Sequence, residues 1–214
     1  MFRNRMDAAE ALTQALAPLN LQQPLVLAIP RGAVPMARVI ADTLRGELDV
    51  VLVRKLGAPG NPEYAIGAVS EQGDITLRPG SAATYGEHYI EAEVAEQSQR
   101  LQQRRAQYTP VRRPVSAAGR HVIVVDDGGA TGATMEAALK AVRAQRPAWL
   151  VAALAVAPPE VVQRLEAQAD AVVCLHAPPH FYAVGQFFED FSQVSDEDVV
   201  RLLAQTGEPG SAAQ

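Results

Sequence analysis

The chain has 214 residues, of which 48% are hydrophobic and 20% charged, with a formal net charge of −5 at pH 7. This is enough for one full core with an appendage, and the acidic balance argues against a nucleic-acid-binding surface. The longest apolar run, 149–157, is well short of the ~20 residues that a membrane span needs, and the single cysteine, Cys174, excludes a disulfide framework. With no signal-peptide pattern at the N-terminus, we expect a cytoplasmic protein that binds neither nucleic acid nor membrane.

Apolar strands alternate with helical patterns along the chain, which is typical of a parallel sheet with helices on both faces. The first predicted helix covers about 7–17, where Asp7 and Glu10 are spaced like a capping box. A second helix is predicted over about 33–44. The predicted strands are 25–29, 49–54, 122–125, 150–156 and 171–175.

One long segment, between Lys55 and Arg120, interrupts this alternation. It contains a Gly/Pro-rich stretch at 57–62, a predicted hairpin at 65–77 and a polar helix at about 87–107. An excursion of this length is usually a lid, a partner-binding element, or both. Acidic and basic residues interleave on the polar helix, which favours an exposed or a subunit-bridging face and leaves a homodimer open.

The most informative segment begins where the strand 121–125 ends, with Asp126 and Asp127. A Gly/Thr-rich turn follows and opens a helix through Met135 and Val142. The first turn of a helix has unpaired N–H groups and a partial positive charge, so it favours a phosphate. The candidate phosphate ligands are Gly128, Gly129, Ala130, Thr131, Gly132, Ala133 and Thr134.

Two carboxylates beside a phosphate site are compatible if they face the hydroxyls of an attached sugar or a Mg²⁺ ion. The predicted ligand is therefore a sugar phosphate. The alternative is that Asp126 and Asp127 begin a plain strand-ending turn, with Thr131 as an ordinary helix N-cap and no ligand.

Two further loops are predicted to join this site, because ligands of open parallel sheets bind beyond the carboxyl ends of the strands. The first, with Arg31 and Gly32, suits a second anion; the alternative is a strand-to-helix turn with a surface arginine. The second starts at Arg54 and Lys55, which we place where the strand 49–54 ends. Lys55 is one of only two lysines and could follow a departing anion, or be a solvated strand-end cation.

The turn at 126–134 resembles the phosphoribosyl-diphosphate signature of the type I phosphoribosyltransferases, in which a hydrophobic strand runs into two acidic residues and a Thr-Gly-x-Thr loop. Pro-Arg-Gly at 30–32, Arg-Lys-Leu-Gly-Ala-Pro-Gly-Asn-Pro-Glu at 54–63 and the Phe-rich segment 181–191 occur in the order seen in a group of predicted bacterial phosphoribosyltransferases without an agreed acceptor. The resemblance implies a Rossmann-like parallel core at 20–56 and 118–176, a lid insertion at 56–118, and a small hood at 177–205 that includes the N-terminal helix. It implies one domain over 1–205, followed by a flexible tail at 206–214.

The resemblance also implies a reaction: Mg²⁺-dependent transfer of a phosphoribosyl group from phosphoribosyl diphosphate to a nitrogenous acceptor. Arg31, Gly32 and Ala33 match the family's pyrophosphate loop. Arg31, Arg54 and Lys55 would neutralise the departing pyrophosphate, while Asp126 and Asp127 would hold the ribose hydroxyls and contact the metal indirectly. The Phe-rich segment would cover the acceptor. The alternative is that it packs as a hydrophobic plug against the N-terminal helix.

Two other functions fit the same residues. One is a non-catalytic sensor of phosphoribosyl diphosphate or a nucleotide on this fold; the other is an unrelated α/β protein that binds a different phosphorylated metabolite. Similar purine-salvage enzymes recognise the base with a lysine on a later strand. This chain has no lysine after Lys140, so the resemblance does not extend to hypoxanthine or guanine as the acceptor.

Overall fold

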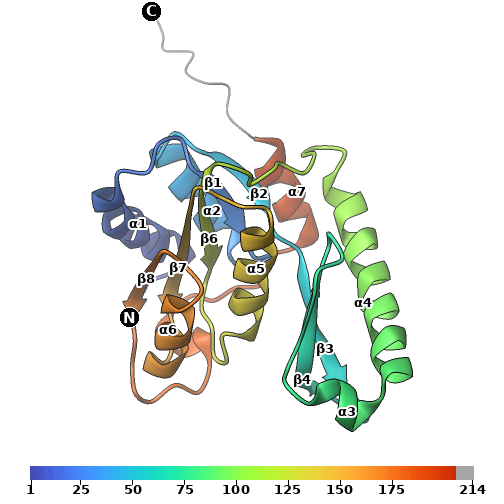
Figure 1. The fold of residues 1–214 in the computed structure, drawn as a ribbon. Coiled ribbons are helices and arrows are strands. Elements are labelled where there is room, and N and C mark those ends of the chain that lie inside the picture. Colours follow the sequence, from blue (N-terminus) through green and yellow to red (C-terminus); the bar gives the residue numbers. More distant parts are fainter. Residues whose placement is uncertain (206–214) are drawn as a thin grey trace, which may run out of the picture.

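The centre of the protein is a five-stranded parallel sheet, seen in a computed structural model that describes residues 1–205 (Figure 1). The predicted flexible tail at 206–214 lies outside the described residues. The strand order is β2-β1-β6-β7-β8. The strands are β1 (Leu25–Ala28), β2 (Glu47–Val50), β6 (His121–Asp126), β7 (Trp149–Val156) and β8 (Ala171–His176).

Helices cover both faces of this sheet, as predicted. One face packs against α1 (Arg5–Leu16) and α2 (Val34–Thr43), and α7 (Asp196–Ala204) packs on α2; the other face packs against α5 (Ala133–Ala144) and α6 (Pro159–Glu166). Side chains alternate along each strand, so Val26 and Ala28 join the first core and Leu25 and Leu27 the second. The strands are apolar throughout because both of their faces are buried.

The sheet has a topological switch point between β1 and β6. The chain leaves β1 through α2 on one face and leaves β6 through α5 on the other, while β1 and β6 pair side by side, Ala28 opposite Val125. The two connections therefore diverge and leave a crevice at the carboxyl ends of these strands, where open α/β sheets bind their ligands. The loops at this crevice are 29–33 and 127–132.

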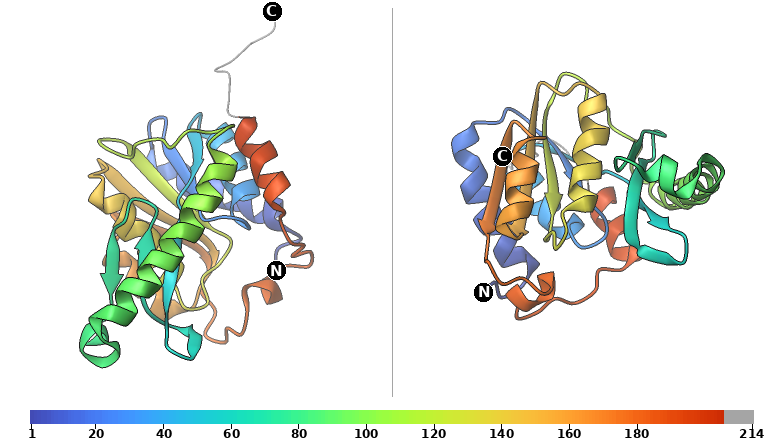
Figure 2. Two further views of the ribbon diagram at one scale, coloured as in Figure 1. Left: turned by 90° about the vertical axis from the view of Figure 1, so that its right-hand side faces the viewer. Right: turned by 60° about the horizontal axis from the view of Figure 1, so that its bottom comes forward.

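The insertion forms a second, antiparallel sheet beside the core (Figure 2). Its strands are β3 (Val53–Ala58), β4 (Asn61–Ser70) and β5 (Ile75–Leu77), followed by the short helix α3 (Ser81–Tyr85) and the long helix α4 (Glu87–Tyr108). A narrow stripe of α4, including Ile90, Leu101 and Tyr108, is buried, whereas most of its surface is polar and exposed. The polar helix predicted at 87–107 is therefore confirmed.

Two sequence predictions were wrong in detail. The strand expected at 49–54 is two strands, because the chain leaves the main sheet after Val50 and enters the insertion sheet at Val53; Arg54 and Lys55 thus lie within β3 and not at a strand end. The first helix begins at Arg5, and its cap is Asn4, whose side chain accepts from the amides of Met6 and Asp7. Asn4 therefore takes the capping role that was assigned to Asp7.

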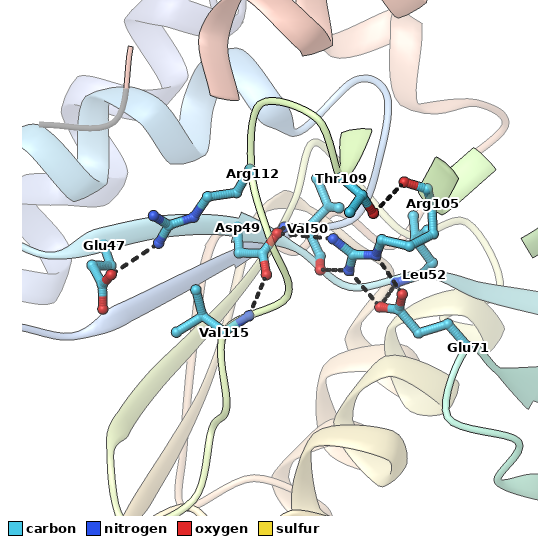
Figure 3. Close-up of polar contacts among 9 residues, drawn as sticks. All are labelled: Glu47, Asp49, Val50, Leu52, Glu71, Arg105, Thr109, Arg112 and Val115. Atoms are coloured by element: carbon cyan, nitrogen blue, oxygen red, sulfur yellow. Dashed lines mark hydrogen bonds and ion pairs between the residues drawn. The ribbon is translucent and has the colours of Figure 1, made fainter. Parts of the chain in front are cut away.

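A buried ion-pair network fastens the insertion to the edge of the core (Figure 3). Arg105, near the end of α4, donates to both carboxylate oxygens of Glu71 at 2.5 and 2.6 Å, to Asp49 at 3.1 Å and to the carbonyl of Val50 at 3.0 Å. Asp49 also accepts from the amide of Val115 at 2.9 Å. Because Arg105 is largely buried and binds Glu71 through two hydrogen bonds, it fixes the insertion where it joins the core.

The segment after β8 packs on the N-terminus. Phe2 forms a parallel bridge with Phe188, with its amide 2.8 Å from the carbonyl of Phe187, and its ring lies 5.4 Å from that of Phe188. The Phe-rich segment thus packs against the N-terminus, as one of its two alternatives expects, and its residues Val184 and Phe191 also line a cavity beside Asp127. Within residues 1–205, no helix has both the length and the apolar character required to cross a bilayer.

Candidate functional site

The turn between β6 and α5 lies at the surface with unused amide donors. The amide of Asp127 donates to its neighbour Asp126, and that of Gly129 donates to Val156 at 3.0 Å. Within residues 1–205, the amides of Ala130, Thr131, Gly132 and Thr134 have no hydrogen-bond acceptor. Ala130 and Thr131 are exposed. The turn is therefore open to an anion, as a phosphate site requires.

Local sequence explains the shape of this turn. Gly132 caps α5 with a φ of +73°, a left-handed conformation that residues with a Cβ rarely adopt, and a Cβ there would lie 2.6 Å from Val161. Arg164 on α6 donates to the carbonyl of Thr131 at 2.6 Å and so holds the turn from outside. With the carbonyl engaged, the amide side is left for a ligand.

The two carboxylates sit beside this turn in different environments. Burial and the adjacent charge of Asp127 raise the pKa of Asp126 well above its usual range. Burial also raises the pKa of Asp127, although the guanidinium of Arg5 opposes this shift. Arg5 donates to Asp127 Oδ2 at 2.8 Å and to the carbonyl of Ser192 at 2.7 Å, and lies 3.8 Å from the centre of the Phe191 ring. Asp127 is thus neutralised from the N-terminus, and Asp126 is not.

The loop after β1 approaches these carboxylates very closely. A Cβ on Gly32 would lie 2.1 Å from Asp127 Oδ2, so only glycine leaves room for the carboxylate. The Pro30–Arg31 peptide bond is cis. The Arg31 guanidinium lies 3.6 Å from Asp196 at the start of α7. The loops at 29–33 and 127–132 therefore meet, as predicted.

A cavity of about 410 Å³ lies where these loops meet the segment after β8; we call it the carboxylate cavity. It is lined by Arg5, Arg31, Gly32, Asp127, Val184, Phe191, Gln193 and Val194. Two guanidiniums, one carboxylate and one aromatic ring thus face a space large enough for a sugar or a small heterocycle.

A smaller space of about 50 Å³, which we call the arginine recess, lies on the insertion side of the same crevice. Its polar lining comes from Arg54, Arg100 and Arg104, and Pro30 and Thr134 border it. Arg54 donates to Gln97 on α4 at 2.7 Å. Lys55 is exposed on the opposite face of β3 and lines neither space. The structure thus brings Arg54 to the two predicted loops but leaves Lys55 outside the site.

Two residues at the site were missed by sequence reasoning. Arg5 is 122 positions from Asp127 and carries no local signal. Arg104 did have one: it shares a helical stripe, at spacings of three and four, with Gln97, Leu101 and Tyr108. That stripe marks the inner side of α4, so Arg104 faces the crevice and not the solvent.

The carboxylates fit a metal that is shared with a ligand. Within residues 1–205, no three His, Cys, Asp or Glu side chains are grouped so that they could hold a metal ion alone. Mg²⁺ commonly uses one or two carboxylates together with waters and substrate phosphates. Asp126 and Asp127 supply such oxygens beside the open turn, so the donor set suits Mg²⁺ brought with a phosphorylated ligand.

Comparisons with known proteins agree with this arrangement. The model of the phosphoribosyl transferase domain family matches residues 3–191. Two Mycobacterium tuberculosis proteins, provisionally named phosphoribosyl transferases, from strains CDC 1551 and H37Rv, are each 40% identical over 95% of this chain. The chain spans about half of their length, 46%.

A solved structure, TT1426 from Thermus thermophilus, is 49% identical and superposes with a TM-score of 0.87 over 96% of this chain and 98% of that one. The fold is therefore shared along nearly the whole chain. Together with the family match over 3–191 and the open turn after Asp126 and Asp127, this shows that the chain belongs to the phosphoribosyltransferase family, whose members are pentosyltransferases.

Proposed function

We propose that this chain binds phosphoribosyl diphosphate with Mg²⁺ and transfers its phosphoribosyl group to a nitrogenous acceptor, releasing pyrophosphate. The observation that carries the proposal is the open turn at 130–134, with its free amides beside Asp126, Asp127 and the Arg31 loop. A phosphate, a diol and a second anion would each find complementary groups there.

The turn would hold the 5-phosphate. The free amides of Ala130, Thr131, Gly132 and Thr134 would donate to its oxygens, and the threonine hydroxyls would add two further donors. The positive end of α5 adds favourable electrostatics. The remaining residues assigned to this subsite, for close backbone approach, are Gly128, Gly129 and Ala133.

Asp126 and Asp127 would accept hydrogen bonds from the ribose hydroxyls. Mg²⁺, when bound, would neutralise negative charge on the diphosphate. The carboxylates would also favour the positive charge that develops on the sugar ring in the transition state. The raised pKa of both groups makes them better proton acceptors than ordinary carboxylates.

The reaction needs no covalent enzyme intermediate. A nitrogen lone pair of the acceptor forms a bond to the anomeric carbon, and the carbon–oxygen bond to the diphosphate breaks with its electron pair going to pyrophosphate. The proton that the nitrogen loses passes to one carboxylate of the pair. Gly32 and Ala33 would let the backbone approach the leaving group, while Arg31 and Arg54 would neutralise it; Lys55, exposed on β3, would add longer-range positive charge.

One observation favours a second candidate, a sensor that binds phosphoribosyl diphosphate or a nucleotide without turnover. Arg5 already occupies Asp127 with an ion pair at 2.8 Å, in a setting where both side chains are only 12–13% exposed. The guanidinium opposes the rise in the pKa of Asp127, so this carboxylate can still bind the sugar but accepts a proton less readily than its burial alone would allow.

Two measurements test these functions. Titration calorimetry with phosphoribosyl diphosphate and Mg²⁺ tests binding, and the absence of heat at millimolar ligand would reject both candidates. A screen of purine, pyrimidine and pyridine bases for pyrophosphate release then separates them. Release with any base supports the transferase, whereas tight binding without release supports the sensor.

A further inference from the structure

The inserted helix α4 brings positive charge to the crevice. Arg104 and Arg100 line the arginine recess together with Arg54, next to Pro30 of the first loop and Thr134 of the open turn. The recess therefore touches both loops that the proposed function assigns to phosphates.

The charges around this recess are not balanced. Within residues 1–205, Arg104 has no ion-pair or hydrogen-bond partner, and Arg54 is bonded only to the neutral side chain of Gln97. Burial and the charges of Arg100 and Arg104 lower the pKa of Arg54. Two half-buried guanidiniums thus lack a carboxylate of their own, which is costly unless an anion is bound.

The nearby acids are already engaged. Glu96 pairs with Arg100, and Glu93 accepts from the amide of Gly57 at 3.1 Å and from Gln97 at 3.1 Å. Asp196 lies between Arg31, at 3.6 Å, and the Tyr108 hydroxyl, which donates to it at 3.2 Å. The charges of Glu93 and Glu96 partly offset the effect of Arg100 and Arg104 on Arg54, but within residues 1–205 no carboxylate forms an ion pair with Arg54 or Arg104.

The position of Arg104 also connects the recess to the first loop. The charges of Arg104 and Arg31 both act on the hydroxyl of Tyr108, whose pKa burial raises to about 12, so both guanidiniums lie close to that buried group. The recess itself, about 50 Å³, has room for a phosphoryl oxygen or a water but not for a diphosphate. A diphosphate would therefore lie over its mouth, between the two loops.

We infer that Arg104 joins Arg54 in binding the diphosphate group of the ligand, so that helix α4 completes the leaving-group subsite. This rests on the proposed function, which assigned no residue of α4 to it. Paired guanidiniums suit the several oxygens of a diphosphate better than one ammonium does.

Calorimetry with two separate probes tests this inference: inorganic pyrophosphate with Mg²⁺, and ribose 5-phosphate. We expect Arg104→Gln and Arg54→Gln each to weaken pyrophosphate binding at least tenfold and to leave ribose 5-phosphate binding within about twofold. Arg104→Lys should keep part of the affinity. The matched control is Arg143→Gln, which removes an exposed arginine paired with Asp170 and should change neither probe.

The outcomes separate the inference from the function beneath it. If the wild-type protein binds both probes and Arg104→Gln binds pyrophosphate equally well, the inference is overturned and the proposed function stands. An equal loss of both probes in Arg104→Gln also overturns it, because the residue would then support the whole site and not the diphosphate. If the wild type binds neither probe, the proposed function fails and the inference with it.

Discussion

The two sides of the crevice differ in how their charge is balanced. On the side of the carboxylate cavity, Asp127 is paired with Arg5 at 2.8 Å, and the N-terminus, the segment after β8 and the first loop all meet around that pair. On the side of the arginine recess, Arg54 and Arg104 have no carboxylate partner within residues 1–205. The first side is thus assembled by its own contacts, whereas the second holds two guanidiniums that no carboxylate of the described residues pairs with.

This difference indicates what each side contributes. The side on which Asp127 is already paired with Arg5 is held in place before a ligand arrives, so it is suited to orienting the sugar of the proposed ligand. An uncompensated positive side gains its favourable energy only when negative charge is present, so it contributes most to the group that carries the most charge. A ligand with a neutral ring between two phosphate groups matches this division.

The largest expected effect comes from removing the acids of the first side. Asp126→Asn combined with Asp127→Asn should weaken binding of phosphoribosyl diphosphate with Mg²⁺ at least a hundredfold, because both the diol acceptors and the metal-facing charges are lost. Calorimetry measures this loss, and circular dichroism checks that the fold is intact.

The matched control for this double variant is Glu10→Gln with Glu166→Gln, which removes two exposed acids from α1 and α6 and should leave the affinity unchanged. Undiminished binding in the aspartate double variant would show that the ligand does not use this side of the crevice.

The next effect concerns the pair that compensates the first side. Arg5→Gln should lower the free energy of unfolding by about 2–3 kcal/mol, because a largely buried carboxylate loses its partner and the guanidinium–aromatic contact with Phe191 disappears. Chemical denaturation measures the loss. In a double-mutant cycle, Arg5→Gln with Asp127→Asn should recover part of it. Strictly additive losses would mean that the pair is not coupled.

A smaller effect, of opposite sign, is expected at Asp126. Its raised pKa means that the folded protein holds the proton more tightly than the unfolded chain, so stability falls as pH rises from the ordinary carboxyl range through the raised value. Asp126→Asn removes this penalty, and the asparagine side-chain oxygen can still accept a hydrogen bond from the amide of Asp127. We expect its melting temperature to exceed that of the wild type by a few degrees at pH 7, with the difference shrinking toward pH 4.

The exposed acid Glu10 again provides the control, since Glu10→Gln should show no such dependence on pH. A lower melting temperature for Asp126→Asn at pH 7 would mean that its carboxylate stabilises the fold, and the assignment of a functional acid held at a cost in stability would be lost.

The first side of the crevice could largely be predicted from sequence. An apolar strand, two acids and a Gly/Thr turn lie together in the chain, so local propensity and the topology of parallel sheets suffice to place them. The helices on both faces follow from the same alternation. Arg5 could not be predicted, because its contact with Asp127 depends on how the N-terminus packs on the segment after β8.

The second side was harder to predict because it depends on the insertion. The chain from Asp49 to Arg54 is predicted as one strand, yet it divides between two sheets, since Val50 ends β2 and Val53 begins β3. That break places Arg54 toward α4 and Lys55 away from it. On α4, charged residues occur on every side of the helix, so the buried stripe of Gln97, Leu101 and Tyr108 that includes Arg104 does not stand out in the sequence.

The smallest effect distinguishes the two neighbours on β3. Because successive strand residues point to opposite faces, Arg54 lies toward Gln97 at 2.7 Å while Lys55 is exposed to solvent, where its charge is screened. Lys55→Gln should therefore change the affinity for pyrophosphate by no more than about twofold at physiological salt, against at least tenfold for Arg54→Gln. The two variants each remove one positive charge from adjacent positions. A difference between their pyrophosphate affinities, measured by calorimetry, therefore reports the direction in which each side chain points. Equal losses would mean that the insertion rearranges to bring Lys55 to the diphosphate, and the division of the crevice into two differently balanced sides would then hold only without ligand.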